Sequence, residues 1–87
     1  MTAIVDTIWS ADVAEAAAVR ALACAGYAWA TFRRGGDPWW LSTATRLSLL
    51  TSEWLTACDY APDRDAASTA RTRELWDRLQ SLGVGLS

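Results

Sequence analysis

The residues that interrupt helices divide this chain into three segments of helical length. Gly35, Gly36 and Pro38 form the first break, Pro62 forms the second, and Gly83 stands near the end. Proline is tolerated at the first position of a helix and glycine is favoured just after its last position, so these residues indicate where helices begin and stop. We expect helices over about 11–33, 38–59 and 64–82.

The residues beside these breaks are suitable helix caps. Ser10, Asp37 and either Asp63 or Asp65 are the expected N-caps, because their side chains accept hydrogen bonds from the N–H groups of the first turn. Gly83 is the expected C-cap of the third helix. Residues 1–9 are then left as a short apolar arm and residues 83–87 as a frayed tail.

Composition also favours an all-α fold. The 87 residues include 17 alanines but only five glycines and two prolines, and alanine has the highest helix propensity. Hydrophobic residues make up 52% of the chain and charged residues 21%, which is too apolar for a disordered protein. We predict a compact three-helix bundle in which residues 1–87 form a single domain.

The helix expected over 38–59 is amphipathic. At about 100° per residue, its large apolar side chains fall on one arc and its polar side chains on the other. Leu49 is the one apolar residue in the middle of the polar arc. The arc expected to be buried contains Trp39, Trp40, Ala44, Leu47, Leu50, Trp54 and Cys58, and the polar arc contains Arg46, Ser48, Ser52, Glu53 and Thr56.

The helix expected over 11–33 is apolar nearly all round. Alanines follow one side, which should let another helix approach closely. The opposite side still carries Val13 and Tyr27, and no charge lies between Arg20 and Arg33. A helix with this pattern is buried on more than one side. We expect its second side to be covered by a partner, by another copy of the chain, or by the arm residues Ile4, Val5, Ile8 and Trp9.

Six tryptophans are more than the core of so small a chain needs. Each ring can bury about 150–250 Å², and tryptophan is a favoured anchor at protein interfaces. Trp39 and Trp40 either both pack against the end of the preceding helix, or one of them projects as a docking anchor. The candidate partner-binding residues are Trp39, Trp40, Arg33, Arg34, Leu49, Tyr27 and Trp9.

The residue types that most catalytic and metal sites require are scarce. Histidine is absent, so there is no imidazole base or imidazole ligand. Cys24 and Cys58 are expected about 16 Å apart along the bundle, beyond disulfide reach, as small buried hydrophobes. We therefore predict no enzymatic activity, metal or cofactor. For catalysis by charge stabilisation alone, Arg20, Arg46 and Glu53 are the residues to inspect first.

Charge argues against nucleic acid and membranes as partners. The net charge is −2 and the sequence pI about 4.8, so no overall positive field attracts nucleic acid. Arginines 71, 73 and 78 could line a groove of DNA, but neighbouring aspartates cancel their field. A membrane span over 13–32 would bury two charges, and its uncharged stretch is shorter than the roughly 20 residues that crossing a bilayer requires. No secretory signal pattern is present, and we expect a cytoplasmic protein.

These features favour a small acidic protein that docks on another macromolecule as an inhibitor, adaptor or assembly subunit. Compact acidic binders without catalytic groups are common among phage and mobile-element accessory proteins, including inhibitors of host defence. The first alternative is a self-assembling structural subunit, dimerising through helix 11–33 or the N-terminal arm. The second alternative is a helical DNA-binding regulator.

Overall fold

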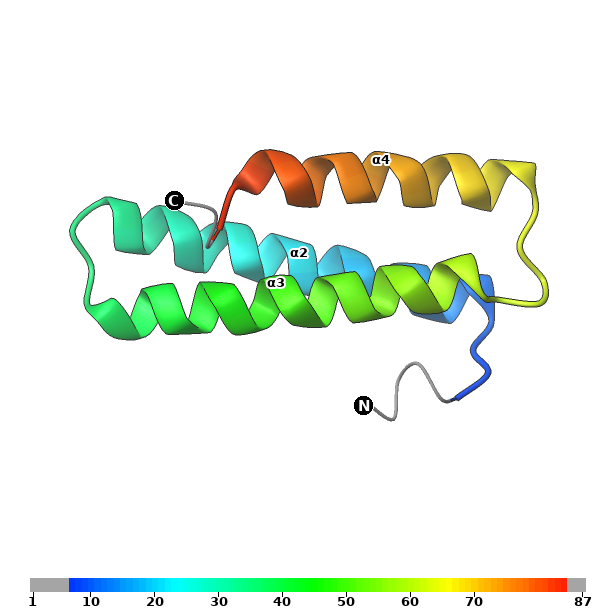
Figure 1. Cartoon of the computed structure of the whole chain (residues 1–87), viewed down its shortest axis with the longest axis horizontal. Coiled ribbons are helices and arrows are strands. Elements are labelled where there is room, and N and C mark those ends of the chain that lie inside the picture. The colour runs from blue at the N-terminus through cyan, green and yellow to red at the C-terminus, as the bar shows by residue number, and fades with distance from the viewer. Residues whose placement is uncertain (1–6, 85–87) are drawn as a thin grey trace.

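Three helices account for most of the described chain, residues 7–84: α2 (Ala11–Arg33), α3 (Pro38–Asp59) and α4 (Ala66–Leu82). In this computed structural model they lie along the long axis of a molecule that measures 42 × 24 × 19 Å (Figure 1). No strand is present among residues 7–84. The predicted all-α three-helix bundle is confirmed, and α2 and α3 begin and end at the predicted residues.

The starts of α2 and α3 are fixed by the predicted caps. Ser10 Oγ accepts a hydrogen bond from the N–H of Val13 at 3.3 Å. Asp37 accepts one from the N–H of Trp39 at 2.8 Å, and proline follows it at the first helical position. Of the predicted arm, residues 7–9 are described and precede this cap without helical structure, whereas residues 1–6 lie outside the described residues.

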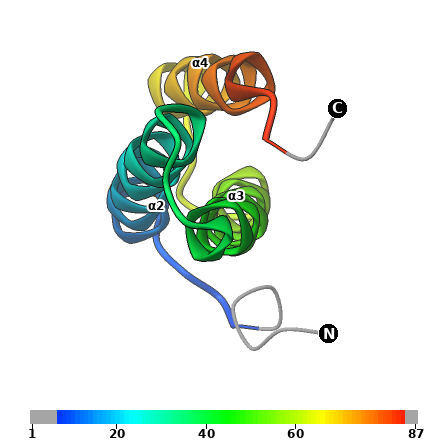
Figure 2. The same cartoon turned by 90° about the vertical axis from the view of Figure 1, so that its left-hand side faces the viewer.

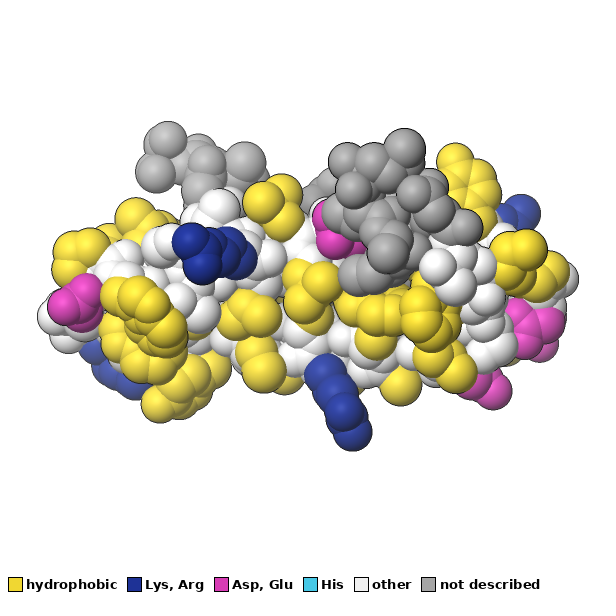
Figure 3. All heavy atoms as spheres, turned by 90° about the horizontal axis from the view of Figure 1, so that it is seen from below, with side chains coloured by type: hydrophobic (Ala, Val, Ile, Leu, Met, Phe, Trp, Pro, Cys, Tyr) yellow, Lys and Arg dark blue, Asp and Glu magenta, His cyan; other side chains and the backbone are white. Residues whose placement is uncertain are grey.

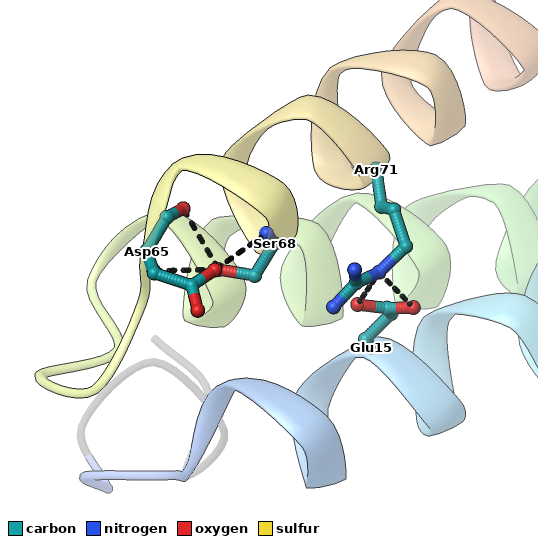
Figure 4. A network of polar contacts seen from close by, with 4 residues as sticks. All are labelled: Glu15, Asp65, Ser68 and Arg71. Carbon is teal, nitrogen blue, oxygen red and sulfur yellow. Dashed lines mark hydrogen bonds and ion pairs between the residues drawn. The ribbon is translucent and has the colours of Figure 1, made fainter.

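The third helix begins at Ala66, two residues later than predicted, because Asp65 and not Asp63 is its cap. Asp65 accepts from the N–H of Ser68 at 2.8 Å, and Ser68 Oγ accepts from the N–H of Asp65 at 2.8 Å (Figure 4). This reciprocal capping box satisfies two backbone donors at once. Asp63 instead accepts from the N–H of Ala11 at 2.8 Å, and this bond ties the α3–α4 loop to the start of α2.

Glycine is required at the turn after α2 and at the end of α4. A Cβ on Gly36 would lie 2.7 Å from the carbonyl oxygen of Thr31, a contact that real side chains avoid. Gly83 has φ 73°, the left-handed conformation that ends helices at little cost in glycine. The predicted C-cap at Gly83 is confirmed, and residues 85–87 of the predicted tail lie outside the described residues.

The helices form an up-down-up arrangement in which α4 covers only one side of the α2–α3 hairpin. Seen end-on, α4 lies against one side of this pair, and no described helix lies on the other side (Figure 2). Residues 7–10 approach α2 from that second side. An ion pair joins α2 to α4, with Arg71 Nε at 2.9 Å from Glu15 Oε1 (Figure 4).

The core lies where the alanine side of α2 meets α3. Ala14, Ala18 and Ala25 are fully buried, and the largest fully buried side chains, Leu55 and Thr51, belong to α3. Leu75 of α4 joins Ala18 and Leu55 in one cluster. The alanine stripe predicted for α2 is therefore the contact between the first two helices.

The buried line of α3 differs from the predicted arc. It runs through Ala44, Thr51, Leu55 and Cys58, and Ser48, predicted to be polar surface, has its hydroxyl oxygen shielded from solvent. Leu47, Leu50 and Trp54, which were expected to be buried, are only half-buried. The reason is that two helices packed through alanines approach closely. The small residues of α3 then occupy the contact, and its larger side chains lie along the flanks.

We expect replacement of Asp65 by asparagine to reduce the acid sensitivity of the fold. Hydrogen bonds from the backbone N–H and then the hydroxyl of Ser68 hold the pKa of Asp65 below its ordinary value. Because the folded-state pKa is lowered, the stabilisation is present above the unfolded-state pKa and is lost as the pH falls through the folded-state pKa. Asparagine also caps helices but does not titrate.

The melting temperature, followed by circular dichroism, should therefore fall more between neutral and strongly acidic pH in the wild type than in Asp65→Asn. Asp77→Asn changes an exposed aspartate later in α4 and serves as the control, which should behave as the wild type. Equal acid sensitivity of the wild type and Asp65→Asn would contradict the capping account.

Candidate docking groove

An apolar groove runs between α2 and α3 on the face that α4 leaves open. Its volume is about 570 Å³, and α2 and α3 each provide one wall. In a view of the face opposite α4, hydrophobic side chains follow most of the length of the molecule (Figure 3). The lining residues are Val13, Ala16, Ala17, Arg20, Ala21, Cys24, Leu47 and Leu50.

The two walls of the groove differ in side-chain size. Three of the six residues in the α2 wall are alanines, and its largest apolar residue, Val13, is 49% exposed. The α3 wall consists of Leu47 and Leu50. This difference follows from the core, because the alanine-rich α2 presents small residues beside the helix contact, whereas α3 places its large residues there. The groove therefore has one flat wall and one raised wall.

Aromatic pairs lie towards both ends of the α2–α3 hairpin. The rings of Trp9 and Trp54 meet edge to face with centroids 5.0 Å apart, near the start of α2. At the other end, the ring of Trp40 meets Tyr27 at 5.8 Å and Trp39 at 4.9 Å, again edge to face. Such pairs contribute about 0.5–1.5 kcal/mol beyond area burial. They extend the apolar surface from the central groove towards both ends.

Among the described residues, Arg20 is the one charged residue that lines the groove. Within residues 7–84 its guanidinium has no hydrogen bond or ion pair. The carboxylate nearest in sequence, Glu15, is already paired with Arg71 of α4. The groove is thus an apolar surface with a single cation available for an incoming anionic group.

A second, smaller groove lies between α3 and α4. Its volume is about 340 Å³ and its lining includes three hydroxyl side chains and one amide. Leu49, the predicted apolar exception on α3, lies here and is 61% exposed. The lining residues are Thr45, Ser48, Leu49, Ser52, Leu79, Gln80 and Val84.

The structure brings together only some of the predicted partner-binding residues. Tyr27, Trp39 and Trp40 form one aromatic group, in which Tyr27 and Trp39 are largely exposed and Trp40 is half-buried. Trp9 lies at the opposite end of the hairpin against Trp54, and Leu49 lies in the second groove.

The two predicted arginines make local contacts within α2 and its cap. The Arg33 guanidinium lies 5.9 Å from the centre of the Trp29 ring, at the edge of cation–π range. Arg34 Nη2 donates to Thr31 Oγ1 at 3.4 Å. Neither arginine lines the groove.

Sequence reasoning misses the groove residues themselves. The position of Val13 on the second apolar side of its helix is the available signal, but the helical projection assigns Leu47 and Leu50 to the buried arc. Cys24 is exposed in the groove, which contradicts its predicted burial, whereas Cys58 is buried as predicted. Burial raises the pKa of the Cys58 thiol.

Comparison of the chain with known protein families, curated proteins and solved structures finds no match. Within the described part of the chain, no three or more histidine, cysteine, aspartate or glutamate side chains gather as a metal site would require. None of the helices described between residues 7 and 84 combines the length and apolar character needed to cross a bilayer.

The two cysteines should react with alkylating reagents at different rates. Cys24 is exposed and Cys58 is buried with a raised thiol pKa, and the thiolate is the reactive form. In native protein at low concentration, iodoacetamide should label Cys24 first, and Cys58 only after unfolding. Mass spectrometry of peptides from timed samples measures both rates. Equal native rates would contradict the burial of Cys58.

Substitution of two tryptophans should separate the packed ring from the exposed one. Trp54 packs against both core clusters, so Trp54→Ala should lower the free energy of unfolding by about 2–3 kcal/mol, somewhat less than for a fully buried tryptophan. Trp39 is 59% exposed and its ring pairs with that of Trp40, so Trp39→Ala should lower it by about 0.5–1.5 kcal/mol. Urea denaturation measures both, and equal losses would contradict the assigned packing.

Proposed function

We propose that this protein is a protein-binding module whose docking surface is the groove between α2 and α3. The observation that carries the proposal is an apolar groove along the face that α4 leaves open, with one cation that no described side chain pairs. Exposed apolar surface of this kind marks interaction sites on soluble proteins. Its action is that of an inhibitor, an adaptor or an assembly subunit, and it needs no catalytic group.

The form of the groove favours a polypeptide over a small molecule. Small-molecule sites are concave and bury most of their ligand, and several placed polar groups fix the ligand's orientation. Here the walls are apolar, and Arg20 is the one charged group among the described lining residues. A helix laid in a groove, by contrast, is held by apolar anchors spaced along its length. The run of surface from Trp54 to Trp40 suits such an extended contact.

Electrostatics favour protein over nucleic acid as the partner. The net charge is −2, and Arg71, one of the three arginines on α4 that could approach a phosphate backbone, is paired with Glu15. Nucleic-acid binding depends on several free cations that displace counterions from phosphates. The described walls of the groove offer a single arginine.

Site-specific photo-crosslinking tests this proposal even though the partner is unidentified. A photoreactive phenylalanine is placed at position 50, in the groove, and in a matched variant at position 49, the adjacent leucine that faces the second groove. Both proteins are produced in cells of the natural source and irradiated. We expect a crosslinked polypeptide of defined mass at position 50 and none at position 49.

A third variant with the crosslinker at Val13 samples the opposite wall and should capture the same polypeptide. Circular dichroism establishes that each variant is folded. If positions 13 and 50 capture no second polypeptide chain, of the same or a different sequence, the groove is not a docking surface and the proposal is wrong. If position 49 alone gives a product, the surface between α3 and α4 is the binding site.

A further inference from the structure

We infer that the polypeptide that fills the α2–α3 groove is a second copy of this chain, related to the first by a two-fold axis that runs along the helices. This inference rests on the proposed docking function of the groove and names its occupant. Two hairpins then face each other, so that α2 of each protomer lies on α3 of the other. The contact is self-complementary in side-chain size and in charge.

Side-chain size supports this arrangement. One wall of the groove is flat and alanine-rich, and the other is raised by Leu47 and Leu50. A two-fold axis along the helices places the raised wall of each protomer on the flat wall of the other. Large residues then fill the space that small ones leave, as close-packed interfaces require.

Charge supports the same arrangement. In the antiparallel hairpin, Ala14 packs against Ala57. Arg20 follows Ala14 by six residues and Thr51 precedes Ala57 by six, so Arg20 and Thr51 lie level with each other along the bundle. A two-fold axis parallel to the helices leaves the position of every residue along the bundle unchanged. Glu53 of the partner subunit is two residues from the level of Arg20, which is about 3 Å along the axis.

Both members of this ion pair are available for it. Arg20 and Glu53 both lack an ion pair or hydrogen bond from their side chains within residues 7–84. Glu53 lies on α3 beyond Leu50, on the side away from the core, where the helix repeat places it about 60° further round. Two copies of the chain thus form two equivalent Arg20–Glu53 pairs across one interface.

The other symmetric arrangement is disfavoured. A two-fold axis perpendicular to the helices and centred on the groove stacks α2 on α2. The two copies of Arg20 then lie within about one helical turn of each other, and like charges at that distance repel. Alanines also face alanines and leucines face leucines, which leaves gaps on one side and crowding on the other.

The face that carries the groove is large enough to hold an interface of standard size. The molecule is 42 Å long and its shorter dimensions are 24 and 19 Å. A face along the long axis therefore has an outline of about 800–1,000 Å², which reaches the roughly 800 Å² that each partner buries in an interface of standard size.

A charge-swap experiment tests the inference with the full chain. Sedimentation velocity from about 1 to 100 µM, the range in which a modest interface dissociates, should show a monomer–dimer equilibrium for the wild type. Arg20→Glu and Glu53→Arg each oppose like charges across the interface. Each should raise the dimer dissociation constant about tenfold or more. The double variant Arg20→Glu/Glu53→Arg restores opposite charges and should return the constant to within about threefold of the wild type.

Arg73→Glu on α4 is the matched control, because it has the same charge change on an exposed residue away from the groove, and it should dimerise as the wild type. Alkylation of Cys24, which lines the groove, gives a second measure. Its rate should fall as the protein concentration rises through the dimer range.

Three results would overturn the inference. The first is a chain that stays monomeric throughout this range while position 50 still crosslinks to another protein, in which case docking stands but its occupant is a different polypeptide. The second is a dimer that neither single charge reversal weakens, which places the interface elsewhere. The third is a monomer in which deletion of residues 1–6 accelerates alkylation of Cys24, which makes that segment the occupant.

Discussion

The close contact between α2 and α3 is the constraint from which the other features of this protein follow. Ala14, Ala18 and Ala25 are fully buried against α3, where Thr51 and Leu55 are the largest side chains that reach complete burial. Helices that meet through such small residues leave no room between them for tryptophan or for a row of leucines. Most of the large side chains of α3 therefore lie along the flanks of the contact. One flank is covered by α4, and the other forms the groove.

This arrangement also explains the tryptophan content. Trp9, Trp29, Trp40, Trp54 and Trp76 are half-buried, and only Trp39 is exposed. Half-buried rings cover the edges of a core that is itself built largely from alanine, and they supply apolar area that the alanines lack. The surplus of tryptophan thus compensates for small core residues as much as it provides docking anchors. The proposed docking surface consists mainly of aliphatic groove walls with aromatic pairs towards the ends.

The helices could be predicted well from the sequence, because caps and breakers act locally. Ser10, Asp37 and Gly83 are recognisable from their own neighbours, whereas Asp63 and Asp65 are hard to distinguish because both can cap a helix. Burial on α3 is predicted less well, since it depends on how closely a second helix approaches. An arc drawn through the largest residues favours Leu50 and misses Ser48 and Thr51. Cys24 is misplaced for a similar reason: whether the second side of α2 is covered depends on where α4 packs.

The central claim is that a second copy of the chain covers the groove, and solvent exposure of the methyl groups in the groove tests this most directly. A soluble nitroxide broadens the NMR signals of exposed methyl groups, and Val13, Leu50 and Leu49 report on the two groove walls and on the second groove. We predict that Val13 and Leu50 are broadened in dilute protein and become protected in concentrated protein, while Leu49 is broadened in both. Protection of Val13 and Leu50 that is the same at every concentration, or absent at every concentration, would contradict self-docking at the groove.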